Sequence, residues 1–336
     1  MMHEVERWAE ELGYSRVAGA LLRGTDQCPT DHPFASEIKS ILEPADELPP
    51  AAAVFCIDSV PTVCLVDQAS LATDSNRRRE QMQQLRERLW NQNLARAVLV
   101  AGGDHFEAWS VDNPKVRREV VTESDSEKIV AWSVGGLTSD DVLKQRNDWF
   151  DPRKRVDKVL LDNITLLIAS LRGDLSMPMA CELIAKVIFV AYLEDRGIVS
   201  EDYRRDRGVH DIYYLLSHLD ATGIVNPFDQ LRQDFNGDFL KPAFASGRDW
   251  HEISETAFIR LSAFLSRTVM RLGQRDFWRY DFGHIPIELI SGIYETFLAS
   301  KEDDAKRRQG AYYFILSYEL IFCAERRNKE TSFITK

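Results

Sequence analysis

Two aspartates, Asp58 and Asp67, stand at the ends of two apolar segments in the first third of the chain. The segments 53–57 and 62–66 are short and rich in Val, Ile and Thr, so they predict two strands joined by a turn. Carboxylates at strand ends can hold Mg²⁺, which activates water and stabilises the leaving oxygen in phosphodiester hydrolysis. Asp58 and Asp67 are therefore candidate metal ligands.

A metal-dependent nuclease of this kind also needs a lysine close to the metal, usually two residues after a strand carboxylate. Asp67 is followed by Gln68 and Ala69, so this lysine is missing. A literal Glu-Ile-Lys occurs at 37–39, but it precedes the strands in a segment expected to be helical. The simpler interpretation is that Asp58 caps a turn and Asp67 ends a strand, so that any ancestral nuclease chemistry has been lost.

Other residues with chemical potential show no productive spacing. The glycines of segment 102–105 lie between two predicted strands, whereas a phosphate loop needs a helix after its strand, so we expect a hairpin turn. Glu194 and Asp195 end a predicted helix and are interpreted as cap and surface-pair residues. The histidines of the second half lack the spacing of metal ligands, as they lie at His210, His218, His251 and His284. Spacing alone indicates no recognisable catalytic apparatus.

The elements that would position these residues change in kind near residue 150. The first part predicts helix, strand pair, helix, strand pair, at 3–13, 53–57, 62–66, 76–91, 97–101 and 106–111. That order is compatible with the nuclease core found in many restriction enzymes. The second part has the apolar periodicity of helices at 154–171, 178–196, 211–219, 253–272 and 286–299.

The predicted fold class is therefore α+β, with a small nuclease-like α/β domain followed by an all-α domain. We assign the α/β domain to residues 1–150 and the helical domain to residues 151–300. Residues 301–336 form either the truncated start of a further domain or a divergent tail.

Charge limits the partners of this chain. Its 336 residues include 42 Lys and Arg against 53 Asp and Glu, a net charge of −11, and residues 1–150 alone carry 16 basic and 25 acidic residues, a net of −9. Such a chain does not coat DNA indiscriminately, because phosphate binding needs concentrated positive charge. A local basic face remains open, since arginine-rich stretches occur at Arg77-Arg78-Arg79, Arg204-Arg205 with Arg207, and Lys306-Arg307-Arg308.

Cysteine usage and hydropathy point to a cytoplasmic protein. The cysteines show neither CxxC spacing nor a Cys/His cluster, so we expect reduced thiols and no zinc site at Cys28, Cys56, Cys64, Cys181 and Cys323. No apolar run reaches the ~18 residues of a membrane-spanning helix. The N-terminus is amphipathic and acidic, unlike a signal peptide. We expect no membrane partner.

Three stretches carry a family resemblance: 189–198 (FVAYLEDRGI), 234–240 (DFNGDFL) and 280–298 (YDFGHIPIELISGIYETFL), followed by QGAYY at 309–313. Together they resemble the region that precedes the catalytic domain in large amino-adenine DNA methyltransferases of restriction-modification systems. Type IIG-like enzymes and related phage-defence methyltransferases are the most similar kind. The resemblance covers roughly residues 155–313, and the first domain is similar to the degenerate nuclease-like domain that often starts such proteins.

In that family, a Gly-x-Tyr-Tyr-Thr-Pro segment lies against the S-adenosylmethionine site. Gly310, Tyr312 and Tyr313 match its start, but Phe314-Ile315 stand where Thr-Pro is expected. The tail to Lys336 holds neither the Gly-rich cofactor loop nor the Asn-Pro-Pro-Tyr loop that receives a flipped adenine. The resemblance thus implies a truncated or split protein, which binds no S-adenosylmethionine by itself. The two tyrosines could also pack as an aromatic patch on a terminal helix.

Three functions remain open. The leading hypothesis is a non-catalytic N-terminal part of a restriction-modification or phage-defence DNA methyltransferase, which contacts DNA or a partner such as a separate methyltransferase subunit. Its phosphate contacts would come from Arg and Lys of the helical half. The second is a Mg²⁺-dependent DNA nuclease using Asp58 and Asp67. The third is a protein-interaction module without a nucleic-acid role, with the apolar stripe after Tyr313 as a surface for self-association.

Overall fold

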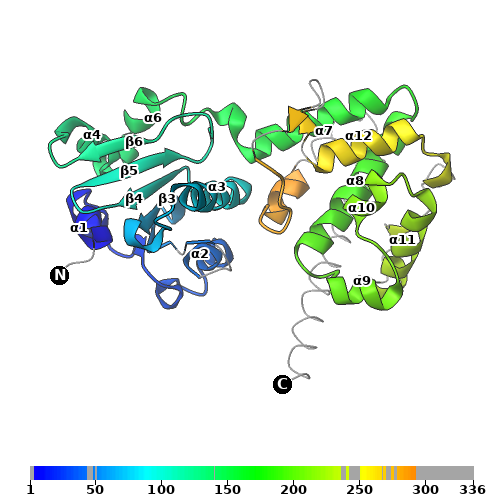
Figure 1. Ribbon diagram of the computed structural model, residues 1–336, viewed down its shortest axis with the longest axis horizontal. Helices are drawn as coiled ribbons and strands as arrows, with labels where there is room; N and C mark the ends of the chain where they lie inside the picture. The colour runs from blue at the N-terminus through cyan, green and yellow to red at the C-terminus, as the bar shows by residue number, and fades with distance from the viewer. Residues whose placement is uncertain are drawn as a thin grey trace, which may run out of the picture. The chain divides into compact units, whose positions relative to one another are not determined.

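The computed structural model describes residues 4–43, 48–49, 51–139, 141–235, 240–241, 250–266, 268–269, 274–275 and 278–292. The chain divides into two compact units, Met1–Val159 and Leu160–Lys336. The first unit is built on a sheet and the second on helices (Figure 1). The predicted α+β class is confirmed.

A six-stranded mixed sheet forms the centre of the first unit, and its strands follow one another in space in chain order. They are β1 Leu21–Leu22, β2 Ala53–Ile57, β3 Val60–Asp67, β4 Ala97–Ala101, β5 His105–Ser110 and β6 Glu119–Thr122. Only β3 and β4 are parallel, and the other neighbours are antiparallel. A parallel pair needs a crossover, which helix α3 (Ser75–Gln92) supplies.

The remaining helices of this unit are short. They are α1 Glu4–Glu11, α2 Ala35–Leu42, α4 Ser126–Trp132, α5 Val134–Thr138 and α6 Asp141–Gln145. The pair α4 and α5, like the edge strands β1 and β6, was not predicted, because each is too short to show a periodicity. Glu37 and Lys39 lie on α2, as the sequence pattern predicted.

Apolar side chains cover both faces of the sheet. On one face, Val63 and Leu65 of β3 pack into a core with Trp8 of α1 and Trp132 of α4. On the other, Cys64 and Val66 are fully buried. Because both faces are buried, β3 appears in the sequence as a continuous apolar run without polar alternation.

The β2–β3 turn has two residues, not the four expected at 58–61. Asp58 and Ser59 both adopt positive φ angles, 50° and 65°, as a tight hairpin turn requires. Pro61 then lies inside β3, opposite a register shift between Phe55 and Cys56. Proline lacks the N–H that a regular ladder uses, so the irregularity accommodates it.

The second hairpin, between β4 and β5, is confirmed. The Gly102 N–H donates to the carbonyl of His105 at 2.9 Å. The indole N–H of Trp8 donates to the carbonyl of Gly102 at 2.9 Å, and Arg7 donates to the carbonyl of Gly103. A Cβ on Gly102 would meet the flexible end of the Gln68 side chain, which can move, and would lie 3.1 Å from the His105 carbonyl oxygen, so this position favours a residue without a side chain.

The second unit is helical. Its described elements are α8 Met177–Asp195, α9 Glu201–Arg207, α10 Ile212–Ser217, α11 Ala221–Phe235, α12 Glu255–Leu265 and a two-stranded sheet, β7 Thr268–Val269 with β8 Gln274–Arg275. Helix α7 (Val156–Leu171) begins in the first unit and continues into the second. Residues 287–292 are also helical.

Helix α8 is the core of this unit. Its residues 183–193 are all buried, on every side of the helix. A helix that is apolar all round must be surrounded by other elements. Within the described part of the chain, no helix combines the length and the apolar character needed to cross a membrane.

Candidate functional site

The candidate metal ligands Asp58 and Asp67 do not meet. Asp58 lies in the turn before β3, and Asp67 is the last residue of that eight-residue strand. A strand rises about 3.3 Å per residue, so the two positions are separated by more than about 20 Å. Carboxylate oxygens bind Mg²⁺ at about 2.0–2.1 Å, so one ion cannot contact both side chains.

Each aspartate has a local role in the backbone. A carboxylate oxygen of Asp67 accepts the N–H of Ala69 at 2.9 Å and begins a short 3₁₀ turn. Asp58 supplies one of the two left-handed turn residues, which Asp tolerates better than most side chains. Across the residues that the structure describes, no three His, Cys, Asp or Glu side chains gather as a metal site would require.

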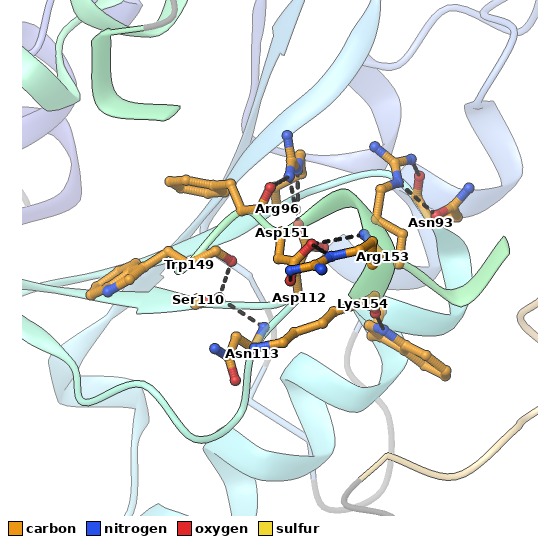
Figure 2. Close-up of polar contacts among 12 residues, drawn as sticks. Asn93, Arg96, Ser110, Asp112, Asn113, Trp149, Asp151, Arg153 and Lys154 are labelled. Atoms are coloured by element: carbon orange, nitrogen blue, oxygen red, sulfur yellow. Dashed lines mark hydrogen bonds and ion pairs between the residues drawn. The ribbon is translucent and has the colours of Figure 1, made fainter. Parts of the chain in front are cut away.

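A polar joint ties the end of the first unit to its sheet (Figure 2). The Arg96 guanidinium donates twice to one carboxylate oxygen of Asp112, at 3.0 and 2.8 Å, and once to the carbonyl of Phe150, at 2.7 Å. The Asp112 side chain is only 6% exposed. The pair is therefore a buried structural ion pair that fixes residue 150 beside β4.

Further side chains hold the residues on either side of Phe150. The Ser110 hydroxyl donates to the carbonyl of Trp149 at 2.7 Å, and the Trp90 indole donates to the carbonyl of Lys154 at 2.8 Å. Arg155 donates to the carbonyl of Asn93 at 2.8 Å. These contacts hold residues 149–155 against the first unit, which extends to Val159.

A second polar cluster lies between α3 and the β5–β6 hairpin. One oxygen of Glu107 is 3.2 Å from Arg78 of α3 and 3.4 Å from Arg118, which precedes β6. The other Glu107 oxygen accepts the indole N–H of Trp109 at 3.1 Å. The Glu107 side chain is only 6% exposed, whereas Arg118 is 49% exposed. The buried carboxylate thus holds two arginines from distant segments side by side.

Arg86 anchors the same hairpin to α3. Its guanidinium donates to the carbonyls of Ser110 and Asn113, at 2.6 and 3.2 Å. Arg86 and Arg118 both contact the Trp109 ring, at 5.4 and 5.5 Å from its centre. Burial lowers the pKa of Arg86 to about 10, so this arginine still carries its charge at neutral pH. The position of residues 113–118 is therefore set by α3.

We call the six cations at or within three residues of the Arg78–Glu107–Arg118 contact the basic surface: Arg77, Arg78, Arg79, Lys115, Arg117 and Arg118. Three of them lie near the start of α3, whose first turn has no acidic residue. Cations at a helix N-terminus oppose the helix dipole and cost about 0.3–1 kcal/mol each at an exposed site. Helix stability therefore does not explain these arginines.

The arginines of the helical unit are used differently. Arg204 donates to the carbonyl of Val199 at 2.9 Å. Arg205 pairs with Asp202, and Arg207 pairs with Asp234 at 2.8 Å. Each therefore has a partner inside the unit. Of the three predicted arginine-rich stretches, only Arg77-Arg78-Arg79 forms part of an exposed basic surface, and 306–308 lies outside the described residues.

Glu194 is partly buried and Asp195 lies at the surface, where it was predicted, but both carboxylates also accept hydrogen bonds from other segments of the unit. Both carboxylate oxygens of Glu194 accept the N–H of Ile212 at the start of α10, at 3.2 and 3.0 Å. Asp195 accepts the Tyr213 hydroxyl at 2.9 Å and the N–H of Phe282 at 3.0 Å. The end of α8 thereby contacts both α10 and the 281–286 turn.

Burial dominates the electrostatics of this joint. It raises the pKa of Glu194 to about 8 and that of Asp195 to about 6. Asp211 raises both pKa values further, whereas hydrogen bonds to the carboxylates lower them. Strongly shifted acids also occur at catalytic sites. Here each shifted carboxylate accepts backbone or tyrosine donors, which is how buried structural acids are satisfied.

Two of the resemblance segments contact each other through this joint. Residues 189–198 include Asp195, and residues 280–298 include Phe282. The Lys186 ammonium, one turn earlier on α8, donates to the carbonyl of Lys241, just after the 234–240 stretch, at 2.7 Å. The contact of Asp195 with Phe282 therefore joins 189–198 to 280–298, whereas Lys186 and Lys241 lie just outside 189–198 and 234–240. Sequence analysis could not detect this contact, because the two segments are far apart in the chain.

The candidate cofactor residues Gly310, Tyr312 and Tyr313 lie outside the described residues. No protein-family model, curated protein or solved structure gives a match to this chain.

Proposed function

We propose that this chain is a non-catalytic part of a restriction-modification or phage-defence DNA methyltransferase system, and that it acts as a scaffold contacting DNA or a partner subunit. The resemblance of residues 155–313 supports the system, and two of its stretches, 189–198 and 280–298, are in contact through Asp195 and Phe282. A partner chain that carries the S-adenosylmethionine site would supply the methyl transfer.

The observation that carries the non-catalytic assignment is the separation of Asp58 and Asp67 by the whole length of β3. The first unit has the helix and strand order that is compatible with a restriction-nuclease core. A nuclease of that kind needs its carboxylates on one metal. Because Asp58 and Asp67 lie at opposite ends of β3, the sheet favours a non-catalytic scaffold over an enzyme that uses these two carboxylates.

Contact with DNA is supported by the basic surface. An acidic chain that exposes a compact group of cations can attract a polyanion locally while repelling it elsewhere. Phosphate contacts of this type position a protein on DNA without reading its sequence. A scaffold needs no more than that, since sequence recognition would belong to the partner.

The test uses the full chain with duplex DNA in two assays. Fluorescence anisotropy should show binding at ~50 mM salt that weakens steeply by ~200 mM, because bound cations release counterions from the phosphates. Plasmid incubated with Mg²⁺ or Mn²⁺ should stay intact. Asp58→Ala and Asp67→Ala should change neither result.

Two results would overturn the proposal. Plasmid cleavage that disappears in Asp67→Ala would establish the Mg²⁺-dependent nuclease. Absence of DNA binding at ~50 mM salt, both alone and with a methyltransferase subunit, would leave the protein-interaction module as the function.

A further inference from the structure

We propose that the basic surface binds the phosphate backbone of duplex DNA. This inference rests on the proposed function, for which it names the contacting residues. It also moves the contact from the helical unit, where the sequence placed it, to α3 and the segment before β6. The surface consists of Arg77, Arg78, Arg79, Lys115, Arg117 and Arg118, as defined above.

Charge contrast is the first argument. Residues 1–150 carry a net charge of −9, yet six cations lie at or within three residues of the Arg78–Glu107–Arg118 contact. The carboxylate that contacts two of them, Glu107, is buried and faces inward. Asp74 is occupied as the cap of α3, where it accepts two backbone N–H groups. Glu80, which follows Arg79, is exposed as well, so the six cations outnumber the acidic residues Asp74, Glu80 and Glu107, and the balance suits a dense polyanion.

The second argument is that contacts within the fold already hold part of the basic surface in position without a ligand. Glu107 holds Arg78 beside Arg118. Arg86 fixes the β5–β6 hairpin to α3 through the carbonyls of Ser110 and Asn113. A partner would not have to order these segments on binding. Such preorganisation lowers the entropic cost of association.

The third argument is that four of the cations make no polar contact with the described part of the fold. Arg77, Arg79, Lys115 and Arg117 are exposed. Among the described residues, none of their side chains has a hydrogen-bond or ion-pair partner. Two of them oppose the dipole of α3 as well. Side chains that stabilise nothing within the fold are free to contact a ligand.

The form of the surface favours duplex over single-stranded nucleic acid. Proteins that bind single strands stack the bases on exposed aromatic rings. The ring of this cluster, Trp109, is only partly exposed and lies against Arg86 and Arg118. The surface offers charges to phosphates but no free ring face to a base.

The experiment compares two triple variants of the full chain. Arg77→Gln, Arg79→Gln and Arg117→Gln together remove three charges from the basic surface. The matched control, Arg16→Gln, Lys144→Gln and Lys158→Gln, removes three exposed charges elsewhere in the same unit. Binding of a labelled 20-base-pair duplex, a length chosen at about two helical turns, is measured from ~50 to ~200 mM salt.

The surface variant should bind at least about tenfold more weakly at ~50 mM salt, and its salt dependence should fall by about three in log–log slope, one for each lost phosphate contact. The control should keep the slope of the unaltered chain. The thermal midpoint of the surface variant should stay equal or rise slightly, because two unfavourable charges leave the start of α3. Loss of binding then cannot be attributed to misfolding.

Three outcomes would overturn the inference. If the unaltered chain binds duplex DNA and both triple variants bind equally well, this surface is not the contact, while the proposed function stands. If single-stranded DNA or RNA displaces the labelled duplex at lower concentration than unlabelled duplex does, the ligand is not a duplex. If the unaltered chain binds no DNA, the inference and the DNA-contacting function both fail.

Discussion

The carboxylate of Asp195 accepts the main-chain N–H of Phe282 at 3.0 Å, which joins two positions that lie 87 residues apart in the chain. The same oxygen accepts the Tyr213 hydroxyl at 2.9 Å. Helix α8 is thereby attached at its C-terminus to α10 and to the 281–286 turn. Asp195 and its neighbour Glu194 therefore join three segments of the helical unit. The stability of this unit should depend on the charge of these two carboxylates.

The helical unit should lose stability as pH rises from about 5 to 8. The folded-state pKa values, about 8 for Glu194 and about 6 for Asp195, lie above the ordinary values of 4.5 and 3.8. At pH values between the ordinary and the folded-state pKa of each group, the folded state holds more protons than the unfolded state. The free energy of unfolding therefore falls with rising pH. Urea denaturation at pH 5 and pH 8, followed by hydrogen exchange in α8 peptides, measures this.

Glu194→Gln should remove most of that dependence. Its amide oxygen can still accept the N–H of Ile212, while the buried charge disappears. We expect a gain on the order of 3 kcal/mol at pH 8 and little change at pH 5. Asp206→Asn, on the exposed side of α9, is the control and should shift stability by no more than about 0.5 kcal/mol at either pH. A parallel pH dependence in Glu194→Gln and the unaltered chain would contradict the assignment.

Gly283→Ala should weaken the same joint. A Cβ at this position would lie 2.7 Å from the carbonyl oxygen of Asp195, so the backbone would have to move. We expect a loss of about 1–3 kcal/mol and faster hydrogen exchange at the end of α8. Gly173→Ala has nothing within 4 Å of its new Cβ and should be neutral or slightly stabilising. Equal behaviour of the two variants would show that the close approach is not limiting.

Arg96→Met should destabilise the first unit strongly. The change leaves the buried carboxylate of Asp112 and the carbonyl of Phe150 without their donor, which costs about 3–5 kcal/mol for a broken buried pair. Arg153→Gln breaks the pair with Asp151, where the arginine is 88% exposed and solvent screens the attraction, so its cost should be far smaller. Urea denaturation, followed by hydrogen exchange in β4 and β5 peptides, compares the two, and similar losses would refute the ranking.

The thiols of Cys56 and Cys64 should resist alkylation while the protein is folded. Burial raises the pKa of Cys56 to about 11 and that of Cys64 to about 12, and the thiolate is the reactive form. Peptide mass spectrometry after brief iodoacetamide treatment at neutral pH should find both unmodified, and denaturant should expose them together. Rapid labelling of Cys64 in the native protein would mean that the sheet opens locally.

Sequence patterns identified the elements whose signals are local. The apolar runs of β2, β3 and β4 and the periodicity of α7 and α8 placed these segments without knowledge of their neighbours. The Gly102–Gly103 turn also followed from local order, because two glycines between strands fit a hairpin. Boundaries were less certain, as β3 begins two residues earlier than expected because Asp58 and Ser59 turn the chain by themselves.

The sequence alone thus determined the α+β class, the four inner strands β2 to β5 of the central sheet and the apolar character of α8, since periodicity and turn residues act over a few positions. Only the tertiary structure decided which distant groups meet. It separated Asp58 from Asp67, joined Asp195 to Phe282, and gathered Arg78 with Arg118 around Glu107. Such pairings depend on how packed elements are placed in space, and the spacing of residues along the chain carries no record of that placement.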